Sequence, residues 1–114
     1  MKELRSFYYA LRGIGHGVKR ERHMRFHLIA ALAVVCAGFW LGISRMEWCL
    51  VMVCIGSVMG AELFNTAIER LTDLASPDRH PLAGQAKDVA AGAVLVISIA
   101  AAIVGALVYI PYII

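Results

Sequence analysis

The chain has 114 residues, of which 61% are hydrophobic, and its mean hydropathy is +0.73. A soluble domain this small could not bury so much apolar surface, which excludes the soluble globular class and indicates one membrane domain. The formal net charge is +3, and seven of the eleven basic side chains lie before Phe26. This distribution is typical of a segment on a membrane surface, and it argues against a nucleic-acid partner because no soluble domain is left to carry one.

The first expected element is an amphipathic surface helix over about residues 1–25. Apolar residues recur at helical spacing in this segment, with basic residues between them: Leu4, Phe7, Tyr8, Leu11, Ile14 and Val18. A helix with one apolar and one basic face lies in the plane of the membrane surface.

Three apolar segments follow, and we expect membrane spans at about residues 26–43, 47–74 and 87–110. The first contains eighteen residues without Asp, Glu, Lys or Arg, and the chain from Val89 onward contains no charged side chain. Helices of this length and hydropathy can cross the ~30 Å hydrocarbon core. The expected fold is an all-α membrane protein, a single domain over residues 1–114 with three transmembrane helices and an amino-terminal surface helix.

The basic residues of the connecting segments predict the orientation in the membrane. The turn at 44–47 has one basic residue, whereas the region 70–87 has three: Arg70, Arg79 and Lys87. Lys and Arg are enriched in cytoplasmic loops, so the amino terminus and the 70–87 region are expected on the cytoplasmic side.

Polar side chains form one stripe on the second predicted span, directly after fourteen uncharged residues. At about 100° per residue, five of them fall on one face of the helix: Glu62, Asn65, Thr66, Glu69 and Asp73. Ionisable residues inside a membrane helix are costly and normally face a protein interior or a functional pathway. The stripe runs from the hydrocarbon toward the predicted cytoplasmic edge, which suits a site that joins a lipid to a water-soluble reagent.

Each carboxylate of the stripe has a functional and a structural interpretation. Glu62, at hydrocarbon depth, can act as a general base or can hold helices together as a paired or protonated group. Glu69, nearer water, can bind Mg²⁺, which prefers carboxylates and substrate phosphates, or can form an ion pair with a helix end or with the neighbours of Arg70. The residue types alone leave these alternatives open.

Charged residues outside the stripe have similar alternatives. Glu21 is either a second metal ligand from the surface helix or the ion-pair partner of Arg25, four residues later. Lys87 either binds a phosphate or extends toward water beside Asp88 at the start of the third span.

Two weaker patterns concern histidines and glycines. His23 and His27 are four residues apart, a spacing that can bind a metal, but no third ligand follows them. Glycines four residues apart, with three residues between them, are common at helix contacts in membranes and occur twice, as Gly38/Gly42 and Gly56/Gly60.

The polar residues together resemble those of the small prokaryotic diacylglycerol kinase family, which consists of integral membrane enzymes. The family signature reads Glu, then Asn-Ser/Thr-Ala-hydrophobic-Glu, then Asp, and this chain matches it at Glu62, Asn65-Thr66-Ala67-Ile68-Glu69 and Asp73. Further matches are Glu21 and the pair Lys87-Asp88 followed by Ala90-Ala91-Gly92-Ala93-Val94. Two segments resemble the Gram-positive-type branch, whose members include undecaprenol kinases: Met46-Glu47-Trp48 and His80-Pro81-Leu82-Ala83.

The resemblance implies a role for each matching residue. Glu62 would be the general base, Asn65 would orient the site, and Glu21 and Glu69 would hold the Mg²⁺ of Mg·ATP. The residues expected at the nucleotide are Tyr9, Glu21, Glu69, Asp73, Asp78, Arg79, His80, Lys87 and Asp88. The resemblance also implies a homotrimer in a bacterial cell membrane, with composite active sites between subunits.

The expected function is a lipid kinase that transfers the γ-phosphate of ATP to the hydroxyl of a membrane lipid alcohol. Undecaprenol is the first expected substrate and diacylglycerol is the alternative. Two other classes remain open from the residues alone. In a small proton-coupled transporter, Glu62 would be a proton relay. In a non-catalytic assembly subunit, the stripe would hold helices together.

Overall fold

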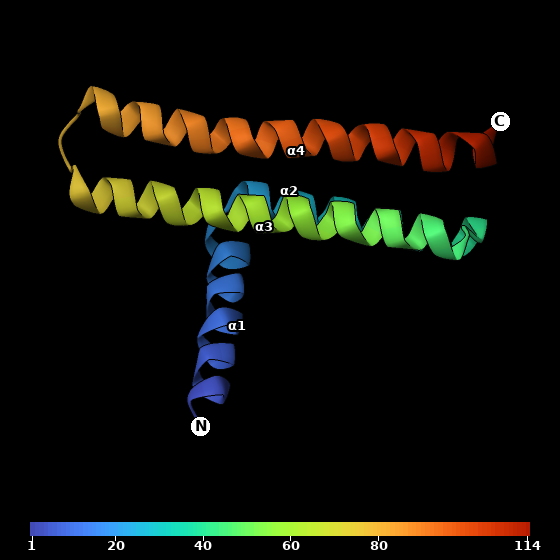
Figure 1. Ribbon diagram of the computed structural model, residues 1–114, viewed down its shortest axis with the longest axis horizontal. Helices are drawn as coiled ribbons and strands as arrows, with labels where there is room; N and C mark the ends of the chain where they lie inside the picture. Colours follow the sequence, from blue (N-terminus) through green and yellow to red (C-terminus); the bar gives the residue numbers. More distant parts are fainter.

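The computed structural model describes residues 1–114 and contains four helices (Figure 1). In chain order they are α1 (Lys2–Arg20), α2 (Arg22–Leu41), α3 (Arg45–Ala75) and α4 (Pro81–Ile113). The three later helices are long and apolar enough to cross a membrane. The prediction of an all-α protein with three candidate membrane spans is therefore confirmed.

The helices α2, α3 and α4 form an elongated bundle, and α1 lies crosswise to it (Figure 1). The central helix is α3, which packs against α4 along most of its length and also contacts α2 and α1. The turn between α2 and α3 lies at the same end of the bundle as the carboxy terminus. At the opposite end, α3 and α4 extend beyond the level at which α1 crosses (Figure 1).

The junction between α1 and α2 differs from the expected helix over residues 1–25. The helix α1 ends at Arg20, because Glu21 has an extended backbone with φ −108° and ψ 117°. Arg25 then donates hydrogen bonds to two carbonyl oxygens of the last turn of α1, at 2.7 Å to Lys19 and 3.4 Å to Val18. These contacts satisfy carbonyl groups that a helix end leaves without partners, and they stabilise the sharp turn.

A glycine permits the close crossing of α1 and α3. A Cβ atom at Gly17 would lie 2.9 Å from Cδ2 of Leu63, closer than side-chain atoms normally approach. A larger residue would require the side chain of Leu63 to move. Gly17 therefore lets α1 pack closely against α3 beside the polar stripe.

Local capping residues set where α3 and α4 begin. Gly42 has a positive φ of 67°, which ends α2, and Ser44 and Glu47 form a reciprocal capping box that starts α3 at Arg45. His80 accepts a hydrogen bond at Nδ1 from the backbone N–H of Leu82, at 3.1 Å, and this cap starts α4 at Pro81. The helix of the third span, expected from about residue 87, therefore begins six residues earlier, and the connection between α3 and α4 is only residues 76–80.

An apolar cluster and the hydroxyl of Tyr109 hold the bundle together near its Arg45 end. Ile43, Val51 and Val108 are buried there. The hydroxyl of Tyr109 donates to the carbonyl oxygen of Val34 at 2.7 Å, which joins α4 to α2. The polar stripe of α3 lies toward the other end of the bundle.

Candidate active site

The polar stripe begins with three residues that α3 buries together. Glu62, Asn65 and Thr66 are only 5%, 9% and 8% exposed, although each carries a polar side chain. Their i, i+3, i+4 spacing places them on one face of the helix, with α2 beside Glu62, α1 beside Thr66 and α4 beside Asn65. Burying such groups is costly unless they find partners, so each partner is informative.

The carboxylate of Glu62 faces an imidazole from another helix. Its Oε2 atom lies 3.6 Å from Nε2 of His27, which belongs to α2, and the side chains of the two residues are 6% and 19% exposed. Thr66 does not bond this carboxylate, because its hydroxyl donates to the backbone carbonyl of Glu62 at 3.0 Å. Glu62 is therefore a buried carboxylate whose oxygens accept no hydrogen bond in the structure and whose one charged neighbour is His27.

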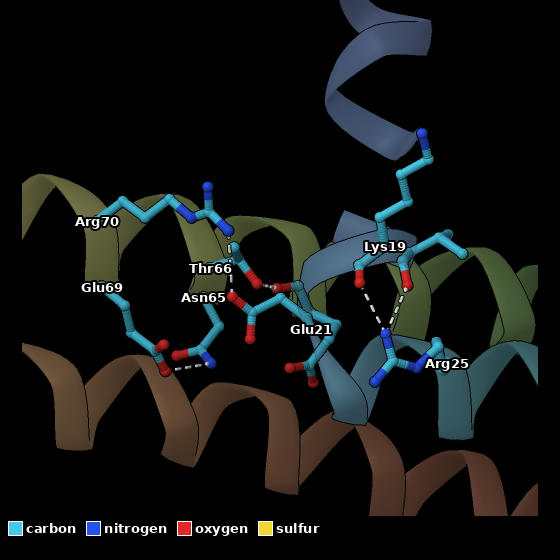
Figure 2. A network of polar contacts seen from close by, with 9 residues as sticks. Lys19, Glu21, Arg25, Asn65, Thr66, Glu69 and Arg70 are labelled. Atoms are coloured by element: carbon cyan, nitrogen blue, oxygen red, sulfur yellow. Dashed lines mark hydrogen bonds and ion pairs between the residues drawn. The ribbon is translucent and has the colours of Figure 1, made fainter. Parts of the chain in front are cut away.

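Asn65 and Glu69 form the next pair along the stripe, on the side of α3 that faces α4 (Figure 2). The Nδ2 atom of Asn65 donates to Oε1 of Glu69 at 3.0 Å. The Oδ1 atom of Asn65 is buried and has no hydrogen-bond partner. Buried oxygens of native proteins are rarely left unpaired, and this one lies in the same amide group that contacts a carboxylate.

Glu21 joins the site from the α1–α2 junction. Its Oε1 atom lies 3.3 Å from a guanidinium nitrogen of Arg70 on α3 (Figure 2). The alternative that Glu21 pairs with Arg25 is wrong, because Arg25 instead donates to the carbonyl oxygens at the end of α1. Glu69 forms no ion pair in the structure, and its side-chain hydrogen bond comes from Asn65.

The donor atoms present fit a Mg²⁺ ion that substrate phosphates help to bind. No group of three or more His, Cys, Asp or Glu side chains that could hold a metal occurs in the structure. Mg²⁺ commonly binds through one or two carboxylates plus phosphate oxygens and water, and the unpaired Oδ1 of Asn65 beside Glu69 is an oxygen of the right chemistry. His23 and His27 form no such metal group.

A polar hollow of about 640 Å³ lies around the Ser76–His80 connection. It brings together five of the residues expected at a nucleotide: Asp73, Asp78, Arg79, His80 and Lys87. Lys87 forms an ion pair with Asp73 across α3 and α4. Lys87 therefore does not simply extend into water beside Asp88.

Two other residues expected at the nucleotide lie apart from this hollow. Tyr9 on α1 is 60% exposed, and its ring packs edge-on against Tyr8 with 5.6 Å between centroids. Asp88 is exposed and makes no side-chain hydrogen bond or ion pair. The structure brings neither residue into contact with the rest of the predicted site.

An apolar groove of about 350 Å³ runs between α2, α3 and α4. None of its lining side chains is Asp, Glu, Lys or Arg, and its walls include Val34, Val51 and Val58. His27 also lines it, and Glu62 lies one helical turn beyond Val58. The groove therefore leads along the bundle to the His27–Glu62 pair.

Sequence reasoning missed His27 and Arg70 as partners of the predicted carboxylates. His27 was considered only together with His23, as a possible metal pair. The available signal was that His27 is the one polar ring in an otherwise apolar segment, a position at which an imidazole normally has a partner. Arg70 carries no comparable signal, because its partner Glu21 is 49 residues away in the sequence.

A membrane bundle with a buried carboxylate and a polar hollow further along the same helix defines a small integral membrane protein with an enzyme-like site. The family profile described as "Prokaryotic diacylglycerol kinase" matches residues 8–109, and the chain belongs to this family of lipid kinases. The chain is therefore an enzyme, and the resemblance of its motifs to this family is confirmed.

Named relatives agree with the family assignment. The chain is 44% identical to an undecaprenol kinase of Bacillus subtilis over 107 residues. These residues make up 94% of this chain and 87% of the relative. It is 38% identical to a diacylglycerol kinase of Synechocystis, over 93% of this chain and 61% of that longer relative. It is 32% identical to the diacylglycerol kinase of Escherichia coli K12, over 83% of this chain and 78% of the relative.

Proposed function

We propose that this lipid kinase transfers the γ-phosphate of ATP to undecaprenol, giving undecaprenyl phosphate. The observation that carries the proposal is the polar stripe itself, which runs from the buried Glu62, next to an apolar groove, toward the polar hollow beside Asp73. A lipid hydroxyl and a water-soluble nucleotide can meet only where such surfaces are continuous. The 44% identity to an undecaprenol kinase favours this lipid over diacylglycerol.

In the proposed reaction Glu62 removes the proton from the lipid hydroxyl. The hydroxyl oxygen then forms a bond to the γ-phosphorus while the bond from that phosphorus to the bridging oxygen breaks, and ADP leaves with the bond electrons. Phosphoryl transfer needs little else than in-line positioning and stabilisation of negative charge. Asn65 orients the site through its hydrogen bond to Glu69.

Glu21 and Glu69 are the residues that would hold Mg²⁺ with the nucleotide phosphates. The ion supplies neutralisation of the phosphate charge. Lys87, now paired with Asp73, lies beside the hollow, where its ammonium can exchange that carboxylate for a phosphate. Asp78, Arg79 and His80 line the same hollow, whereas Tyr9 and Asp88, also proposed as nucleotide contacts, lie apart from it within one chain.

The proposed location is a bacterial cell membrane, with the amino terminus and the active site on the cytoplasmic side. The 33 residues of α4 reach about 50 Å, more than the ~30 Å hydrocarbon core, so part of the bundle lies in water. Figure 1 shows α3 and α4 extending past α1, and this favours α1 as a surface helix with the Ser76–His80 connection in the cytoplasm. The basic residues of α1 agree with this orientation.

A homotrimer with composite sites is the proposed assembly. Gly56 and Gly60 lie on α3, and a Cβ atom at either position would meet nothing within 4 Å. A small-residue pair that no helix of its own chain contacts closely favours a second subunit there. Gly38, by contrast, already packs against Trp48 within the chain, and Gly42 serves as the end of α2.

A labelling assay tests the function. Purified protein is given [γ-³²P]ATP with undecaprenol or diacylglycerol in the same detergent, and kcat/KM is compared. We expect labelled undecaprenyl phosphate at the higher kcat/KM, with partial activity on diacylglycerol, because differences in apolar contact are worth only ~1–3 kcal/mol. A clear advantage for diacylglycerol would contradict the substrate assignment. Proton flux without any labelled lipid would support the transporter instead.

A further inference from the structure

His27 has no role in the reaction as described so far, yet it is the side chain that faces the general base. Its Nε2 atom lies 3.6 Å from Oε2 of Glu62, beyond hydrogen-bond distance. The two groups are therefore adjacent without bonding each other. His27 is also much less exposed than His23, one turn earlier on the same helix.

The 3.6 Å between Nε2 of His27 and Oε2 of Glu62 allows one hydroxyl group to form a hydrogen bond with each of them. A hydroxyl offers one donor hydrogen and two acceptor lone pairs. An oxygen atom placed about 2.8 Å from both Nε2 and Oε2, to one side of the line between them, can donate to Glu62 and accept from His27. The carboxylate oxygen and the imidazole N–H are the complementary pair that an alcohol needs.

The apolar groove provides the place for the rest of such a molecule. His27 is one of its lining residues, and the groove contains no charged side chain, so a hydrocarbon chain can fill it. Its volume of about 350 Å³ is at the lower end of the ~300–1,000 Å³ typical of ligand pockets, which suits a single chain. The groove is thus apolar along its length and polar at one end, and a long-chain alcohol has the same arrangement of apolar and polar parts.

We infer that His27 is a binding residue for the acceptor, whose hydroxyl lies between His27 and Glu62 while its first chain segment occupies the groove of α2, α3 and α4. The inference rests on the proposed function and adds to it where the lipid binds and which group holds its oxygen. His27 donates from Nε2 to the hydroxyl oxygen. Glu62 takes the hydroxyl proton, the oxygen forms its bond to phosphorus, and His27 ends the step with its own proton unchanged.

Substitutions of His27 separate binding of the lipid from binding of the nucleotide. His27→Leu removes the donor at similar size, so we expect kcat/KM for undecaprenol to fall about tenfold while KM for ATP stays within about twofold. His27→Gln restores an N–H donor at a similar reach and should recover activity to within about threefold of wild type. His23→Leu, one turn away and exposed, is the matched control and should change neither constant.

The result that overturns the inference is also defined by these variants. Three outcomes would each contradict a hydrogen-bond donor to the lipid hydroxyl at His27. The first is full activity in His27→Leu, and the second is an equal rise of KM for ATP and for undecaprenol in that variant. The third is a His27→Gln variant that is as impaired as His27→Leu. None of the three would bear on whether the wild-type protein is a kinase.

A binding measurement on the wild-type protein does not depend on the folding of any variant. The four histidine rings are labelled with ¹⁵N, and their NMR signals are followed in micelles without ATP. Undecaprenol should shift the His27 signal and leave His23 unchanged, whereas the corresponding hydrocarbon, which has no oxygen to accept a hydrogen bond from Nε2, should produce a much smaller shift. Equal shifts with both lipids, or none at His27, would overturn the inference. A selective shift in a protein that phosphorylates no lipid would contradict the kinase function and leave the alcohol site intact.

Discussion

The two ends of the bundle differ in how many hydrogen-bond partners their buried and half-buried polar groups have. Near the Arg45 end, Glu47 accepts hydrogen bonds from the backbone N–H of Ser44, at 2.8 Å, and from the hydroxyl of Tyr112. Tyr109 also has a partner there, the carbonyl oxygen of Val34. At the other end, Glu62 has only an imidazole at 3.6 Å, and Oδ1 of Asn65 has no partner at all.

This difference separates polar groups that stabilise the fold from polar groups that are available for chemistry. A polar group whose hydrogen bonds are complete contributes rigidity, because changing its partners would cost those bonds. A buried group with missing partners is unfavourable in the isolated chain and gains when a substrate or ion supplies them. Variants at the two ends should therefore change different properties.

Glu62→Gln should give the largest effect on activity of any single change at the stripe. Gln has nearly the shape of Glu but cannot accept the hydroxyl proton, and a general base typically contributes ~10²–10⁴-fold to the rate. We expect the rate of lipid phosphorylation to fall by about this factor while the protein still inserts and keeps its oligomeric state. A variant that retains more than about a tenth of wild-type turnover would show that Glu62 is not the base.

Glu21→Ala and Glu69→Ala should each raise the Mg²⁺ concentration needed for half-maximal activity, as well as lower the rate. Each removes a carboxylate that would hold the ion, and Mg²⁺ depends on such oxygen ligands. The measurement is a Mg²⁺ titration at fixed ATP. Glu3→Ala is the control, because Glu3 is an exposed residue of α1 far from the stripe in sequence. Unchanged half-saturation in both variants would rule out the metal role.

A mixing experiment tests whether one site uses residues of two chains. Inactive Glu21→Ala and Glu62→Gln subunits are combined in equal amounts and allowed to reassemble. If Glu21 and Glu62 of one site come from neighbouring subunits of a symmetric trimer, about a quarter of the sites regain both residues, and about a quarter of wild-type activity should return. Without any restored activity, each site would lie within one chain, as the contact of Glu21 with Arg70 would then suggest.

The sequence was sufficient to predict the helical class and the polar stripe, because both follow from local patterns. Apolar runs indicate spans, and the spacing of Glu62, Asn65 and Glu69 places them on one helix face whatever the rest of the chain does. The helix ends were predicted less well. The start of α4 at Pro81 depends on the side chain of His80 as a cap, within a segment whose composition is typical of a loop.

The partners of the stripe could not be predicted, because they join residues far apart in the sequence. Nothing local to Glu21 distinguishes Arg70 from the nearer Arg25, and the choice depends on how α1 crosses α3 at Gly17. The contact of His27 with Glu62 likewise depends on the packing of α2 against α3. Such pairs depend on the tertiary packing of the helices, and they determine which carboxylates are free to bind a substrate.

Ser44→Ala should give the smallest effect, and it should affect stability rather than catalysis. The hydroxyl of Ser44 accepts from the backbone N–H of Glu47 at 3.2 Å and caps the first turn of α3. Losing a serine cap typically costs about 1 kcal/mol, and Ser44→Asn should restore it. Unfolding of the purified protein by SDS in mixed micelles would measure this difference.

The same preparations also report on the difference between the two ends. Ser44→Ala should keep the wild-type kcat/KM for both substrates, whereas Glu62→Gln should keep wild-type resistance to SDS and lose its activity. If Ser44→Ala lowered kcat at a detergent concentration where it remains folded, the capped end of the bundle would influence catalysis. The completeness of its hydrogen bonds would then be part of how the distant stripe is held in place, and the two ends would not be independent.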